Sequence, residues 1–165
     1  MFEIGCGNGA LIRKLRELGH DAIGVDTSES GVALAGPHCS VGSAYDDLAG
    51  QYGRFPVVVS LEVVEHLMEP RRFARAAFDL LEPGGVAIIS TPFHGYWKNL
   101  ALALTGRMDD HFGPLWDGGH VKFWSERTLG ELLREAGFDA VRFERAGRIA
   151  PLAKSMVAIA HRAGG

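Results

Sequence analysis

The chain has 165 residues, enough for one domain with a substantial core, and its composition is 47% apolar and 22% charged, which is ordinary for a soluble globular protein. The formal net charge of −3 argues against a general nucleic-acid-binding protein, because such proteins usually carry an excess of Lys and Arg. The two cysteines, Cys6 and Cys39, lack the spacing of a metal site or a disulfide scaffold. We therefore expect a cytoplasmic protein with neither a signal peptide nor a membrane span.

Hydrophobic periodicity predicts strands that alternate with helices along the chain. In chain order these are a strand at 2–5, a helix at 9–19, strands at 21–26, 38–43 (weak) and 55–64, a helix at 70–85 that stops at Pro83-Gly84-Gly85, a strand at 86–91, a helix at 125–138, and strands at 140–146 and 155–162. Such alternation indicates βαβ crossovers. The predicted fold class is α/β: a doubly wound, mostly parallel seven-stranded sheet in three layers, forming a single domain over 1–165.

A long irregular stretch at about 92–124 interrupts this alternation and is rich in Gly, Asp and aromatic residues. Its first part, "YWKNLALAL" at 96–104, indicates an amphipathic helix. Aromatic side chains beside acids and His suit a lid over an organic acceptor, and loops of this length are often functional. The alternative is an ordinary capping insertion that packs on the sheet.

A glycine-rich turn, "GCGNG" at 5–9, separates the first strand from the first helix. Its glycines let a ligand approach the backbone, and the following helix presents free N–H groups. Asp26, at the end of the second strand, can accept both hydroxyls of a ribose, so we expect a nucleoside-containing cofactor. Glu3 places a carboxylate next to the turn, which disfavours a pyrophosphate and suits a ligand with an ammonium and a sulfonium.

Several segments occur in register over residues 2–92: "FEIGCGNG", "GVD", "VVVSLEVVEHL" and "LLEPGGVAIISTP", and "HVKFWSERTLGELLREAGF" extends them. Together they resemble the successive motifs of class I S-adenosylmethionine (SAM)-dependent methyltransferases, most closely the branch containing the ubiquinone-biosynthesis O-methyltransferases. The resemblance implies a Rossmann-like methyltransferase fold with SAM as cofactor. It also implies methyl transfer to a small-molecule acceptor, with oxygen as the expected methyl-accepting atom.

The resemblance further implies which residues hold SAM. Those around its methionine part would be Glu3, Gly5, Cys6 and Gly7. Those near the ribose and adenine would be Asp26, Thr27, Ser43 and Ala44, with Asp46 or Asp47. Leu61 and Glu62 would border the sulfonium. At position 43 many relatives carry an acid, where this chain has Ser.

Methyl transfer from a sulfonium is an in-line displacement in which the protein mainly positions the acceptor. An oxygen acceptor often needs a base or a metal that favours its oxyanion. The catalytic candidates are His66, His94 and His120, with His111 as a further possible base. His94 follows the fifth strand, at the carboxyl edge of the sheet where such folds bind ligands.

"LEVVEHL" at 61–67 is predicted to open a helical turn, which would place Glu62, Glu65 and His66 on one face, with His120 as a fourth ligand. The pattern resembles the E-x-x-E-H and distant His of metal-assisted small-RNA 2′-O-methyltransferases, and it is similar in the ubiquinone branch. The resemblance implies a divalent cation: Mg²⁺ or, because of the two imidazoles, Mn²⁺ or Zn²⁺. In the alternative, Glu65 makes local hydrogen bonds and His66 lines the pocket or acts as a base.

Members of this family usually carry helices before the first strand. We therefore expect a truncated relative or a misassigned start, with a natural minimal version and an open cleft as the alternative. Two other functions stay open. One is an NAD-type oxidoreductase that uses the same turn, and the other is a non-catalytic SAM-fold module that serves as a partner.

Overall fold

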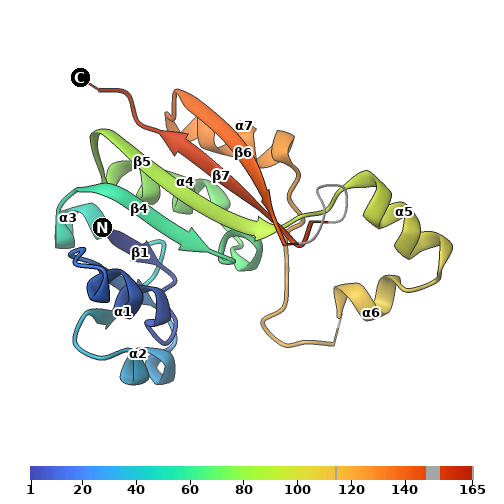
Figure 1. Ribbon diagram of the computed structural model, residues 1–165, viewed down its shortest axis with the longest axis horizontal. Coiled ribbons are helices and arrows are strands. Elements are labelled where there is room, and N and C mark those ends of the chain that lie inside the picture. Colours follow the sequence, from blue (N-terminus) through green and yellow to red (C-terminus); the bar gives the residue numbers. More distant parts are fainter. Residues whose placement is uncertain (114, 148–152, 165) are drawn as a thin grey trace.

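The computed structural model describes residues 1–113, 115–147 and 153–164, and within them one seven-stranded sheet forms the centre of the molecule (Figure 1). In space the strands lie in the order β3-β2-β1-β4-β5-β7-β6. Their bounds are β1 Phe2–Ile4, β2 Ile23–Asp26, β3 Cys39–Val41, β4 Phe55–Leu61, β5 Leu81–Pro92, β6 Ala140–Ala146 and β7 Ser155–His161.

Helices cover both faces of the sheet (Figure 1). Their bounds are α1 Ala10–Glu17, α2 Glu29–Ala35, α3 Leu48–Tyr52, α4 Pro70–Asp79, α5 Tyr96–Leu104, α6 Met108–Phe112 and α7 Glu126–Ala136, and a 3₁₀ turn, η1, spans Val64–His66. The helices α3, α4 and α7 contribute to the core on one face, and α1 and α2 pack on the other beside β1 to β3. This three-layer arrangement confirms the predicted fold class.

The path of the chain through the sheet creates a place for a ligand. The strands β1 to β5 are parallel, and β7 runs antiparallel between β5 and β6. From β1 the chain moves outward through β2 to β3, and then crosses to the other side of β1 to form β4. Such a reversal of strand order opens a crevice at the carboxyl ends of the strands, where open α/β sheets bind ligands.

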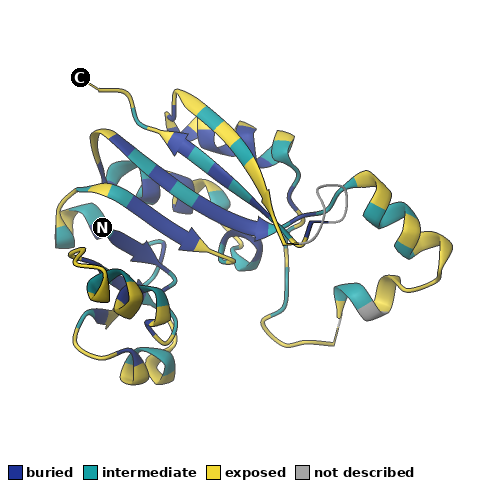
Figure 2. Cartoon of the chain, viewed as in Figure 1, coloured by how far each residue is buried: buried dark blue, intermediate teal, exposed yellow. Residues whose placement is uncertain are grey.

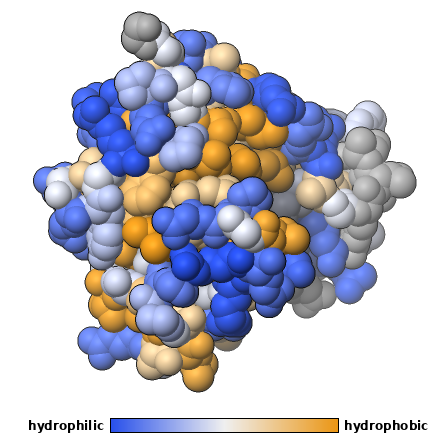
Figure 3. All heavy atoms as spheres, turned by 60° about the vertical axis from the view of Figure 1, so that its left-hand side comes forward, coloured by the Kyte–Doolittle hydropathy of each residue, from blue (hydrophilic) through white to orange (hydrophobic). Residues whose placement is uncertain are grey.

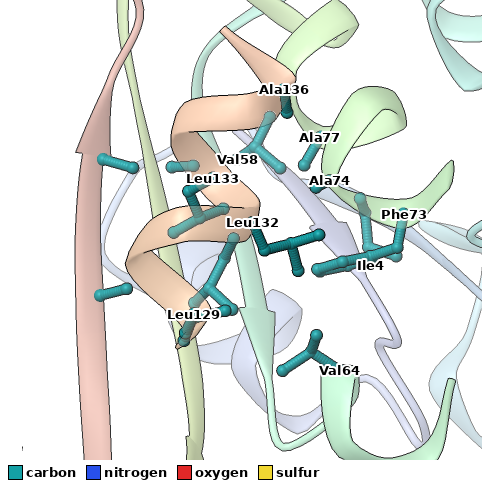
Figure 4. Close-up of a cluster of buried hydrophobic side chains, with 14 of the residues drawn as sticks. Ile4, Val58, Val64, Phe73, Ala74, Ala77, Leu129, Leu132, Leu133 and Ala136 are labelled. Atoms are coloured by element: carbon teal, nitrogen blue, oxygen red, sulfur yellow. The ribbon is translucent and has the colours of Figure 1, made fainter. Parts of the chain in front are cut away.

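The larger core lies between the sheet and the helices α3, α4 and α7. Figure 4 shows Ile4 and Val58 of the sheet close to Phe73 of α4 and Leu133 of α7, all of them buried. Side chains alternate between the faces of a strand, so Glu3 lies on the opposite side from Phe2 and Ile4. That side holds a smaller buried cluster formed by Cys6, Ile12, Ala22, Ala35 and Cys39.

The same side of the sheet is less covered over β5 and β7 (Figure 2). Ile88 and Ile159 are paired in register and only half-buried, whereas their neighbours Ala87 and Ala160 are fully buried against the larger core. On the face of the molecule seen in Figure 3, hydrophobic side chains gather near the centre, with hydrophilic ones around them. The two faces of these strands therefore differ in how completely they exclude water.

Besides α6 in the insertion, two helices, α2 and α3, are missing from the sequence prediction. Each begins at a capping side chain: Ser28 Oγ accepts a hydrogen bond from the Gly31 N–H at 3.1 Å, and Asp47 Oδ1 accepts one from the Gly50 N–H at 3.0 Å. With 7 and 5 residues, these helices are too short to show a helical period in the sequence. The capping residues Ser28 and Asp47 were the sequence signal from which these two helices could have been predicted.

The helix predicted over 70–85 ends earlier, at Asp79, and β5 begins at Leu81. The Phe55 N–H donates to Leu80 O at 2.8 Å, and Phe55 pairs with Leu81, so β4 draws this segment into the sheet. The Pro-Gly-Gly sequence therefore lies within a β-strand next to a shift in register, and it is not a helix stop. The strand predicted over 55–64 likewise ends at Leu61.

Candidate functional site

A cavity of about 300 Å³ opens at the carboxyl ends of β1 to β4. Its wall is formed by residues at or just after these strand ends: Ile4, Gly5, Val25, Asp26, Thr27, Gly42, Ser43, Ala44, Tyr45, Leu61, Glu62, Val63, His66 and Leu67. Most of the residues predicted to hold the cofactor therefore surround one hollow. Glu3, Cys6 and Gly7 are not part of this wall.

The glycines of the first turn differ in how a side chain at each position would be accommodated. Gly5 has a φ of +83°, and a Cβ built on it would overlap Cγ2 of Val63. A Cβ on Gly9, at the start of α1, would lie 2.8 Å from the Cβ of Ala35. Gly7 has a φ of +51° but open space around it. The turn thus packs tightly at both ends and is open in the middle.

Asp26 links the end of β2 to the glycine turn. Its Oδ2 accepts a hydrogen bond from the Gly7 N–H, and its Oδ1 accepts one from the Ser28 N–H, each at 2.8 Å. A carboxylate oxygen has two lone pairs, so these bonds leave acceptor capacity for a ligand hydroxyl. Asp26 lies on the cavity wall, and its contact with a ribose stays a prediction.

Glu3 and Cys6 lie behind the wall. Glu3 is only 4% exposed, and its Oε2 has no hydrogen-bond partner among the described residues. Burial, and then the nearby Asp26 carboxylate, raise the pKa of Glu3 to about 7, so a large share of it is neutral at physiological pH. Burial likewise raises the pKa of the Cys6 thiol, next to Cys39, which argues against a nucleophilic role. Direct contact of Glu3, Cys6 and Gly7 with SAM stays a prediction.

The loop after β3 is closed by its own hydrogen bonds. The Ser43 N–H donates to Asp46 Oδ2 at 2.7 Å, and Ser43 Oγ accepts from the Tyr45 N–H at 3.1 Å. Asp47 caps α3 instead. Ser43 and the buried Ala44 line the cavity, whereas neither Asp46 nor Asp47 is part of its wall, and a contact of either acid with the adenine stays a prediction.

Residues 62–66 do not form one helical face. Glu62 has a φ of 55°, which places it outside the short turn η1 over Val64–His66. Its Oε1 accepts a hydrogen bond from Ser90 Oγ at 2.7 Å. Sequence reasoning missed Ser90, although a hydroxyl at the end of the apolar strand "VAIIS" was a usable signal.

Three of the four predicted metal ligands come together. Ligand atoms of Glu65, His66 and His120 all lie within 4.8 Å of one another, and Glu62 is not part of this group. Glu65 is 1% exposed, and although Thr91 is nearby, neither Glu65 carboxylate oxygen reaches a partner with hydrogen-bond geometry among the described residues. Burial raises the pKa of Glu65. A buried carboxylate without partners is costly, and a cation would compensate it.

The tautomer of His66 follows from its partner. His66 Nδ1 lies 2.8 Å from Gly118 O, and a carbonyl oxygen only accepts, so Nδ1 carries the proton. The lone pair of His66 is then on Nε2. Metal-binding histidines commonly donate their other ring N–H to a backbone carbonyl in this way. The His120 ring lies 4.9 Å from the His66 ring, and burial lowers the pKa of His120.

A second group of rings lies beyond β5, around His94. The half-buried His94 ring stacks with Phe112 at 5.9 Å and meets Phe123 edge-on at 5.2 Å, with His111 at 5.8 Å. Burial, and then the nearby Lys98, lower the pKa of His94 to about 4, so its imidazole is neutral at physiological pH. Burial also lowers the pKa of His111. Aromatic walls around neutral imidazoles suit a planar organic acceptor.

The insertion extends away from the end of β5 (Figure 1). The predicted helix over 96–104 is confirmed as α5, and α6 follows it. Large apolar side chains on and after these helices are exposed: Tyr96, Trp97, Leu104, Met108, Leu115 and Trp116. A closing lid stays a prediction. No helix within the described ranges is long and apolar enough to cross a membrane.

Solved structures share this fold. A SAM-dependent methyltransferase from Archaeoglobus fulgidus is similar with a TM-score of 0.75 and 18% identity, over 98% of this chain and 85% of that one. A SAM-dependent methyltransferase from Methanosarcina mazei has a TM-score of 0.70 and 20% identity, over 99% and 92% of the two chains. The arrangement of strands and helices is therefore that of the SAM-dependent methyltransferase fold.

The family profile described as "Methyltransferase domain" matches residues 1–142, so the chain belongs to this family. Among its relatives, ubiquinone biosynthesis O-methyltransferases of Cereibacter sphaeroides and Ruegeria pomeroyi are 32% and 33% identical over 150 residues. These matches cover 86% of this chain and 60% of each relative. The chain thus spans about three fifths of the length of these relatives. Membership in a methyltransferase family favours SAM over the NAD-type oxidoreductase alternative.

Proposed function

We propose that the protein transfers a methyl group from SAM to an oxygen atom of a small-molecule acceptor. The observation that carries the proposal is the cavity at the reversal of strand order, where Gly5 and Asp26 occupy the positions expected for a SAM site. Family membership and the names of the relatives at 32–33% identity support the same reaction. A cytoplasmic location stays an expectation.

The protein itself takes little part in the covalent chemistry of this reaction. An acceptor oxygen attacks the methyl carbon, the carbon–sulfur bond breaks, and its electron pair stays on sulfur, which yields S-adenosylhomocysteine. The proton of the acceptor hydroxyl needs a base. We assign this role to His94, because its imidazole is neutral and its Nδ1 is buried without a partner among the described residues. His66 and His120 then remain available to hold a cation.

A divalent cation fits the group formed by Glu65, His66 and His120. One carboxylate and two imidazoles favour Mn²⁺, Zn²⁺ or another transition metal over Mg²⁺, which prefers oxygen ligands. When bound, the ion would lower the pKa of the acceptor hydroxyl. In this reading the protein contributes the buried Glu65 carboxylate and the fixed tautomer of His66.

The methyl-transfer proposal is tested by turnover. The purified chain is incubated with methyl-labelled SAM and a panel of phenols, catechols and carboxylic acids, and labelled products are identified by mass spectrometry. We expect transfer to an oxygen acceptor by the wild type and a loss of at least tenfold in Asp26→Asn, since charge-assisted hydrogen bonds are worth roughly 1.5–3 kcal/mol each. Binding of SAM without transfer to any acceptor would instead support the non-catalytic module.

The cation is tested separately. Metal-free protein is titrated with Mn²⁺, Zn²⁺ and Mg²⁺, and binding is followed by calorimetry in the wild type and in Glu65→Gln, His66→Gln and His120→Gln. We expect one tight site that each of these substitutions removes and that the matched Glu62→Gln retains. If the wild type binds no ion, or if turnover is indifferent to a chelator, the metal assignment is wrong.

A further inference from the structure

Glu62 holds an unusual backbone conformation. It is the only non-glycine residue in the described ranges with a positive φ, at 55°. This left-handed region is disfavoured for a residue with a Cβ, because the Cβ crowds the backbone. Conformations of this kind persist only where neighbouring groups enforce them, and they gather at ligand sites. We therefore ask which function requires a glutamate at this position.

Ser90 of β5 enforces the conformation. The Glu62 N–H lies 3.1 Å from both Ser90 O and Ser90 Oγ, and Ser90 Oγ in turn donates to Glu62 Oε1 at 2.7 Å. The buried serine therefore accepts from the backbone of Glu62 and donates to its carboxylate. These bonds fix the side chain of an otherwise exposed residue at the cavity wall.

The position on the wall matches one end of SAM. If Asp26 binds the ribose and the adenine lies toward Ser43 and Ala44, the part of the wall left for the methionine end includes Gly5 and Glu62. That end carries an ammonium, a sulfonium and an α-carboxylate, so its net charge is positive and its two cations attract a protein carboxylate. Glu3, the other acid near the turn, is buried behind the wall. Glu62 is the carboxylate on this part of the wall.

We propose that Glu62 supplies the negative charge that recognises the cationic methionine end of SAM, and that Ser90 is the residue that positions it. The inference rests on the proposed use of SAM. It explains the strained backbone, because φ near +55° brings the carboxylate to the wall while Ser90 in β5 holds it. It also gives Glu62 a role different from that of the group formed by Glu65, His66 and His120.

The test compares two ligands that differ in their charged end. SAM carries both cations, whereas 5′-methylthioadenosine has the same nucleoside but neither the ammonium nor the sulfonium. Calorimetric titrations of both are made with the wild type and Glu62→Gln, in EDTA so that no metal contributes. Glutamine still accepts from Ser90, so the substitution removes only the charge. Glu131→Gln, on the exposed face of α7, is the matched control.

We expect Glu62→Gln to bind SAM about tenfold more weakly and methylthioadenosine unchanged. Ser90→Ala should show a smaller loss for SAM alone. Glu62→Gly should raise the melting temperature of the unliganded protein while SAM affinity falls, which a merely structural role would not produce. Equal losses for both ligands, or no loss for SAM in folded Glu62→Gln, would overturn the proposal. If the wild type binds neither ligand, the SAM assignment itself fails.

Discussion

The proposed cofactor side and the proposed acceptor side of the site are built in different ways. The cofactor side is formed by the ends of four parallel strands, and its loops are tied by bonds such as that from the Gly7 N–H to Asp26. The acceptor side is formed by rings from the insertion, and many of its apolar side chains are exposed. Strand ends fix positions through the sheet, whereas the insertion is free to vary with the acceptor. Changes on the two sides should therefore have separable effects.

The largest expected effect is on the cofactor side, at Gly5. Gly5→Ala combines a positive φ with an overlap on Val63. We expect it to destabilise the fold by about 2–4 kcal/mol and to abolish measurable SAM binding. Chemical denaturation and calorimetry measure the two effects. Gly7→Ala is the matched control: it has a positive φ but open space, so a loss of only about 1 kcal/mol is expected. Equal stability of the two variants would contradict the packing argument.

On the acceptor side, Trp116→Ala should affect turnover and little else. Trp116 is 62% exposed, and its ring meets the His66 ring edge-on at 6.0 Å. Its removal should change the free energy of unfolding by less than about 0.5 kcal/mol and leave SAM affinity unchanged, as for most surface positions. Turnover on the acceptor found in the panel should fall. Leu115→Ala, 96% exposed, is the control and should behave like the wild type. A drop in SAM affinity in Trp116→Ala would show that the two sides are coupled.

A change in the acid sensitivity of folding is expected through His94. Burial lowers the pKa of His94 from its ordinary value of 6.5 to about 4, so the neutral form is favoured in the folded state. The stability linked to this neutrality is fully present above pH 6.5 and is lost as the pH falls toward 4. His94→Gln should remove this part of the pH dependence, measured as the free energy of unfolding between those values. His20→Gln, at an exposed loop position, should retain it. An identical pH profile for wild type and His94→Gln would contradict the assignment.

The two sides also differ in how far the sequence predicts them. Asp26 and Leu61 end strands with strong sequence patterns, and Gly5 directly follows one. Parallel strand ends meet at one edge of the sheet, so the convergence of these residues was predictable. The group of Glu65, His66 and His120 was predicted through a resemblance, but the helical face on which it was placed does not form. The positive φ of Glu62 and its bonds to Ser90 depend on contacts between β4 and β5 that no local pattern encodes. The packing of Phe112 and Phe123 around His94 likewise depends on how the insertion folds back.

The central claim is that the cavity after β1 to β4 is a SAM site. Calorimetric titration of the wild-type chain with SAM, S-adenosylhomocysteine and NAD⁺ tests it most directly. We predict that SAM and S-adenosylhomocysteine each bind at a single site, that NAD⁺ does not bind, and that Asp26→Asn weakens both adenosyl ligands by about tenfold or more. Binding of NAD⁺ in preference to SAM, or unchanged SAM affinity in a folded Asp26→Asn, would contradict it.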